Sequence, residues 1–129
     1  MLLQRLRFIA HIAYLIAAWV LVAMVVAQVF LAGSAVLVNP GNWNPHRDMG
    51  HMIGMPIILM FVLSIAGWMP RRFPLLSVGL FVLYGLQYFF LHWPSPNLYF
   101  IRAFHPVNAL SIFMTAAYVA REAWRFVRR

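Results

Sequence analysis

Residues 8–32, FIAHIAYLIAAWVLVAMVVAQVFLA, contain no charged side chain. A helix needs about 20 predominantly apolar residues to cross the hydrocarbon core of a bilayer, so this stretch predicts a membrane span. Basic residues precede it, as they precede the apolar region of a signal peptide. The apolar run is longer than such a region, and we therefore expect an uncleaved first helix.

The remaining charged residues divide the chain in the same way, leaving uncharged stretches at 8–46, 49–70, 73–101 and 103–120. They predict four spans, at about 8–32, 46–69, 74–93 and 105–120. Residues 33–45 and 94–97 contain prolines and small polar residues and are predicted loops, and a tight turn is expected around residue 71. Short connections make neighbouring helices antiparallel. The sequence thus predicts one all-α domain over 1–129, an integral membrane up-down-up-down four-helix bundle with its second and fourth helices diagonal.

Composition supports a membrane location and excludes several classes of function. Of the 129 residues, 64% are hydrophobic and 9% are charged, which is too apolar for one small soluble core. Ten basic residues face two acidic ones. The arginines lie at the ends of apolar runs, which favours lipid headgroups over nucleic acid as their partners. Their distribution places both termini in the cytoplasm. Without cysteine, the chain has no disulfide or thiolate metal site.

Polar side chains in the spans gather in the half that this topology assigns to the outside. Such residues are costly in a bilayer unless they find partners or serve a function. At one depth, each span contributes one of Gln28, His51, Gln87 and Asn108, and a shallower ring contains His46, His92 and His105. If they face inward, these residues line a polar, histidine-rich pocket.

One interpretation of this pocket is a haem site. A b-type haem between membrane helices needs two imidazoles at matching depth on facing helices, and His46 and His105 meet the depth requirement. The i, i+4, i+8 spacing of His46, Gly50 and Gly54 places them on one helix face, where a porphyrin could lie against backbone. The rival interpretation of the two glycines is close helix approach. His51 is an alternative ligand, about 140° around the helix from His46.

Two other interpretations compete with haem. Met49, Met52 and Met55 follow i, i+3, i+6 spacing beside the histidines, and thioether with imidazole is a ligand set for copper(I). Methionine also fills helix interfaces without binding metal. The third interpretation is structural: the polar residues hydrogen-bond across helices and specify packing. Paired carboxylates, phosphate loops and zinc-protease motifs are missing from the sequence, so we expect at most a redox component carried by a cofactor.

Several of these residues also carry a resemblance to a known family. The run 28–33 (QVFLAG), the run 46–50 (HRDMG), Gln87 and the run 105–110 (HPVNAL) together resemble an uncharacterised family of small prokaryotic four-helix membrane proteins, domain of unknown function 6220. The similarity is expected to cover nearly the whole chain. It implies the bundle architecture, a multi-pass location in the prokaryotic cytoplasmic membrane, and a polar pattern of Gln28, His46, Gln87, His105 and Asn108, without an activity.

Histidines on the second and fourth helices also resemble the arrangement in membrane cytochromes b. The leading hypothesis is therefore haem b in the outer half, ligated by His46 and His105 and flanked by Gln28, Gln87 and Asn108. Such a protein would pass single electrons between a quinone, or another membrane donor, and a partner. The alternatives are a structural or accessory subunit of a larger membrane complex that binds no cofactor, and a copper-binding membrane protein.

Overall fold

A computed structural model describes residues 1–92 and 96–129 of the chain. In order, the helices are α1 (Leu2–Leu37), η1 (Pro40–Asn42), α2 (Trp43–Met52), α3 (Gly54–Ala66), α4 (Arg72–Leu91), η2 (Pro96–Ala103) and α5 (Phe104–Val127). They form four helical stretches that are long and apolar enough to cross a membrane. The expected end of the third span at residue 93, and residues 94 and 95 of the expected loop, lie outside the described residues.

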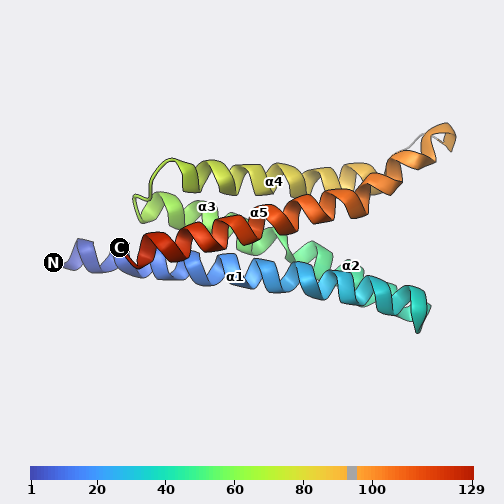
Figure 1. Ribbon diagram of the computed structural model, residues 1–129, viewed down its shortest axis with the longest axis horizontal. Coiled ribbons are helices and arrows are strands. Elements are labelled where there is room, and N and C mark those ends of the chain that lie inside the picture. Colours follow the sequence, from blue (N-terminus) through green and yellow to red (C-terminus); the bar gives the residue numbers. More distant parts are fainter. Residues whose placement is uncertain (93–95) are drawn as a thin grey trace.

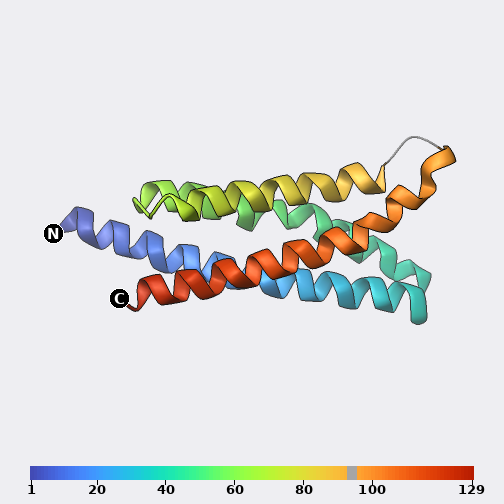
Figure 2. The same ribbon diagram turned by 45° about the horizontal axis from the view of Figure 1, so that its top comes forward.

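The helices form an antiparallel bundle (Figure 1). Helix α1 packs against α3 and α5, and α4 packs against the same two helices. Within the described part of the chain, α3 and α5 do not contact each other, so the second and fourth spans are diagonal, as predicted. Both termini lie at one end, which we call the proximal end. At the opposite, distal end, α2 stays beside α1 while the start of α5 stays beside α4, and the two pairs diverge (Figures 1 and 2).

The loop predicted over 33–45 is wrong, because most of this segment is helical. Helix α1 continues to Leu37, and only residues 38 and 39 separate it from η1. Asn39 caps η1 by accepting a hydrogen bond from the Gly41 N–H at 2.9 Å. Pro40 and Pro45 each occupy the first turn of a helix, where a missing N–H costs no hydrogen bond. The prolines that predicted a loop therefore begin helices instead.

The second span is also different from the single helix predicted over 46–69. It breaks at Ile53, between α2 and α3. Pro56 lies in the first turn of α3, and it cannot donate the N–H that a continuous helix would direct at the Met52 carbonyl. The break places Gly50 in α2 and Gly54 at the start of α3.

The core runs along the bundle axis, and large apolar side chains cover its outside. Tyr14, Ile57 and Leu80 are fully buried, whereas Ile58 and Leu110 are more than half exposed. Extensive apolar exposure on all helices is the pattern expected of a bundle surrounded by lipid. At the proximal end, the buried Glu122 carboxylate is paired with arginines of α4 and α5.

Candidate functional site

The first histidine of the expected site, His46, is fixed by the helix beside it. Its Nδ1 lies 3.1 Å from the main-chain carbonyl oxygen of Gln28 on α1. A carbonyl only accepts hydrogen bonds, so Nδ1 carries the hydrogen and the neutral ring keeps its lone pair on Nε2. The half-buried ring also packs edge-on against Trp43, with a centroid distance of 5.3 Å.

The second histidine, His105, has the same arrangement in the other half of the bundle. Its Nδ1 donates to the main-chain carbonyl of Gln87 on α4 at 3.2 Å, and its ring is half-buried. Both expected ligands therefore have one tautomer, with Nε2 unprotonated in the neutral ring. An Nδ1–H bonded to a carbonyl is the usual way in which a metal-binding histidine is oriented.

Next to His46, the side chain of Gln28 is incompletely paired. Its Oε1 is buried and accepts no hydrogen bond from the described residues. Its Nε2 lies against Gly50, where an added β-carbon would be only 3.0 Å away. A side chain at position 50 would therefore displace the Gln28 amide. Gln28 and Gly50, both expected at the site, do lie together with His46.

Next to His105, the corresponding side-chain oxygen, that of Gln87, accepts a hydrogen bond. Asn108 is 7% exposed and donates through Nδ2 to the Leu83 carbonyl at 2.8 Å and to Gln87 Oε1 at 2.7 Å. Its two N–H groups can serve these two acceptors. Asn108 thus holds the side chain of Gln87, and the main-chain carbonyl of Gln87 orients His105.

Gly54 faces a different neighbour from the one expected. A β-carbon at this position would lie 3.0 Å from the ring atom Cε1 of Tyr84, which belongs to α4. Gly50 lies against Gln28 of α1 and Gly54 against Tyr84 of α4, so the two glycines have different neighbours in the bundle. The contact with Tyr84 supports the alternative interpretation, close helix approach, at this glycine.

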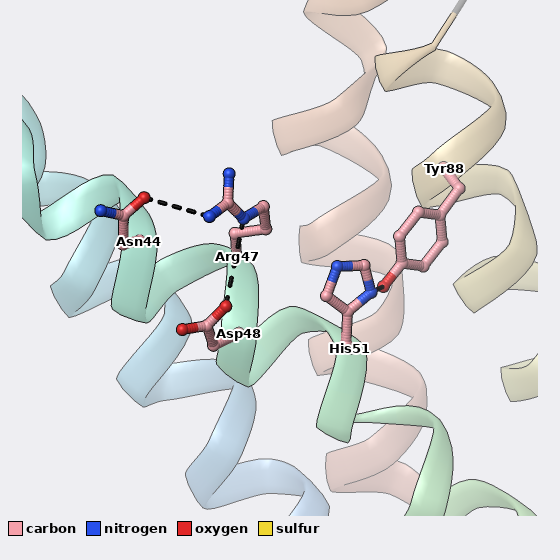
Figure 3. A network of polar contacts seen from close by, with 5 residues as sticks. All are labelled: Asn44, Arg47, Asp48, His51 and Tyr88. Carbon is pink, nitrogen blue, oxygen red and sulfur yellow. Dashed lines mark hydrogen bonds and ion pairs between the residues drawn. The ribbon is translucent and has the colours of Figure 1, made fainter.

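His51 turns away from this site and joins a tyrosine network on α4 (Figure 3). Tyr84 Oη donates to the carbonyls of Gly50 and His51, each at 3.2 Å. The single hydroxyl hydrogen of Tyr84 is used in these bonds. In the 3.1 Å contact between the two hydroxyl groups, Tyr88 therefore donates and Tyr84 accepts. Tyr88 Oη in turn accepts from His51 Nδ1 at 3.0 Å. This count of hydrogens gives His51 the same tautomer as His46 and His105.

Tyr84 and Tyr88 are not among the site residues that the sequence predicts. The signal was their four-residue spacing, continued by His92, which places all three on one face of α4. The His92 Nδ1 donates to the Tyr88 carbonyl at 3.0 Å, and its ring stacks on that tyrosine. Only the fold brings His51 next to Tyr88.

The methionines and the charged pair of α2 lie mainly at the surface. Met49 is half-buried, whereas Met52 and Met55 are 54% and 67% exposed. Arg47 contacts Asn44 at 3.1 Å and Asp48 at 4.0 Å on an exposed face (Figure 3). No group of three or more histidine or acidic side chains that could hold a metal ion occurs within residues 1–92 and 96–129.

The fold and the site together define a small four-helix protein of membrane type, with oriented imidazoles at the distal end. The chain belongs to a family of unknown function, DUF6220, which its sequence matches over residues 28–92. This match includes Gln28, His46 and Gln87, but it ends before His105 and Asn108, so it covers less of the chain than expected. No curated protein and no solved structure shows significant similarity to the chain.

Proposed function

We propose that this multi-pass membrane protein binds a b-type haem at its distal end, where His46 and His105 would hold the group, and transfers single electrons. The observation that carries the proposal is that the His46 and His105 rings have the same tautomer and the same type of hydrogen-bond partner. Each donates Nδ1–H to a helix carbonyl and keeps the Nε2 lone pair of its neutral form for a metal. When bound, a haem would supply the one-electron chemistry.

The surrounding residues are compatible with this group. One histidine comes from the second span and the other from the fourth, the two spans that lie diagonally in the bundle. Gln28 contributes a buried oxygen without a partner among the described residues, and the Gln28 amide packs directly against the backbone of Gly50. Asn108 and Gln87 brace the ring of His105. Copper is a weaker proposal, because Met52 and Met55 face outward.

Location and partners are part of the same proposal. The arginine-rich proximal end is taken to face the cytoplasm of a prokaryotic cell, which places the histidines in the outer half of its membrane. The protein would exchange electrons with a membrane quinone or with a larger membrane complex.

The test is a reduced-minus-oxidised absorption spectrum of protein purified in mild detergent from haem-replete membranes. We expect a low-spin haem b signal at about one haem per chain. His46→Ala and His105→Ala should each abolish the signal. His11→Ala is the matched control, because His11 lies at the proximal end, bonded to the Gly67 carbonyl. If both distal variants gave the wild-type spectrum, His46 and His105 would be excluded as haem ligands.

A structural or accessory role is the second candidate, and the same contacts favour it. His46 ties α2 to α1, and His105 ties α5 to α4, in each case through a carbonyl of the neighbouring helix. For this role, His46→Ala should lower the melting temperature of a protein that is colourless from the start. A colourless wild-type protein with unchanged melting in both histidine variants would contradict both candidates.

A further inference from the structure

The two halves of the chain repeat each other at a spacing of 59 residues. Gln28 and Gln87 differ by 59 positions, and so do His46 and His105. In each pair the histidine donates Nδ1–H to the main-chain carbonyl of the glutamine 18 residues before it. The same contact is thus built twice, once between α1 and α2 and once between α4 and α5.

Core positions follow the same spacing. Fully buried residues lie at both members of several pairs 59 positions apart: Leu21 and Leu80, Ile57 and Ala116, and Met60 and Val119. The helix contacts follow the repeat as well, with α4 corresponding to α1 and α5 to α3. The α1–α3 contact corresponds to the α4–α5 contact, and the α1–α5 contact corresponds to the α3–α4 contact. Each half therefore behaves as one repeat of a helical hairpin, arranged as in membrane proteins with parallel internal repeats.

The repeat is broken at one position that matters for the site. Asn108, which satisfies the Gln87 side chain, corresponds to Met49 in the first half. Gln28 consequently lacks the donor that its counterpart has, and its Oε1 is buried without a partner among the described residues. An unpaired amide oxygen in a medium of low dielectric is destabilising. Its presence in one repeat only suggests that a ligand supplies the missing hydrogen.

We propose that Gln28 Oε1 accepts a hydrogen bond from a ligand held at the distal end, so that the first repeat binds the polar part of this ligand. The inference rests on the proposed function: for haem, the donor is a propionic acid group in its protonated form. With Met49 in the first repeat this acceptor stays unpaired, whereas Asn108 pairs the corresponding oxygen of Gln87 in the second.

The repeat supplies a matched pair of variants for the first test, the melting temperature of ligand-free, full-length protein in detergent. Gln28→Met removes an unpaired group and should leave melting unchanged or raise it. Gln87→Met removes the acceptor of Asn108 and should lower melting by about 5 °C. Equal losses in the two variants would overturn the proposal, because Gln28 would then have a protein partner.

The second test measures binding of haem and of haem dimethyl ester, which lacks the acid hydrogen. Gln28→Met should weaken haem binding about tenfold, the equivalent of one hydrogen bond, and leave ester binding unchanged. Met49→Asn, which restores the repeat, should raise melting and also weaken haem binding. Equal haem affinity in wild type and Gln28→Met overturns this inference alone. Failure of the wild type to bind haem overturns the proposed function, and with it the assignment of haem as the donor.

Discussion

Asn108 donates a hydrogen bond to the side-chain oxygen of Gln87 at 2.7 Å, joining α5 to α4 deep in the distal half of the bundle. The same amide reaches the Leu83 carbonyl. Because the main-chain carbonyl of Gln87 orients His105, these contacts couple a packing residue to an expected ligand.

The first prediction follows from this coupling. Asn108→Leu leaves the Gln87 oxygen buried without a donor and should reduce the free energy of unfolding by about 2 kcal/mol. Chemical denaturation in detergent measures the change. Asn44→Ala is the control, since Asn44 accepts a hydrogen bond from Arg47 on an exposed face, and it should change stability by less than about 0.5 kcal/mol. Similar losses in both variants would argue against the buried amide contact.

A second prediction concerns the glycines. Gly54→Ala should destabilise the bundle by about 1–3 kcal/mol, because the new β-carbon would lie 3.0 Å from the Tyr84 ring and force α3 and α4 apart. Gly79 on α4 has nothing within 4 Å of a β-carbon, so Gly79→Ala should be neutral or stabilising through helix propensity. Thermal unfolding of the two variants gives the comparison. A stable Gly54→Ala protein would show that α3 and α4 do not pack this closely.

A third prediction tests the tautomer of His51. Nitrogen chemical shifts of labelled protein should show the hydrogen of the neutral ring on Nδ1, because Tyr88 accepts it. Tyr88→Phe removes the acceptor and should move the population toward the Nε2–H form. His92, which donates to the main-chain carbonyl of residue 88, keeps its partner and should not change tautomer. An unchanged His51 spectrum in the variant would exclude the network.

The fourth prediction concerns the proximal end. Glu122 lies 3.0 Å from Arg72 and 2.8 Å from Arg125, with its side chain 11% exposed. Glu122→Gln should cost about 2–3 kcal/mol, because it leaves two arginines without their shared anion. Asp48→Asn breaks an exposed pair with Arg47 at 4.0 Å and should have little effect. Equal melting temperatures for the two variants would show that burial does not strengthen the Glu122 pairs.

Local features could be predicted from the sequence where a single physical signal dominated. The four apolar stretches indicated four helices, and the diagonal placement of the second and fourth followed from short connections. The prediction of a loop over residues 33–45 was wrong because proline is compatible both with a loop and with the first turn of a helix. The break at Ile53 was missed for a related reason, since Pro56 lies in an apolar run that otherwise continues through it.

The sequence by itself determined the helical class, the apolar exterior and the depth of the polar residues along each helix, because hydrophobicity and rise per residue are local properties. Only the tertiary structure decided that His46 faces α1 while His51 faces Tyr88. It also decided that Gln87 is paired and Gln28 is not. The neighbour that each histidine meets is set by how the helices pack against one another, which the residues of a single helix do not fix. Similarly, the atom that carries an imidazole hydrogen is fixed by a partner distant in sequence.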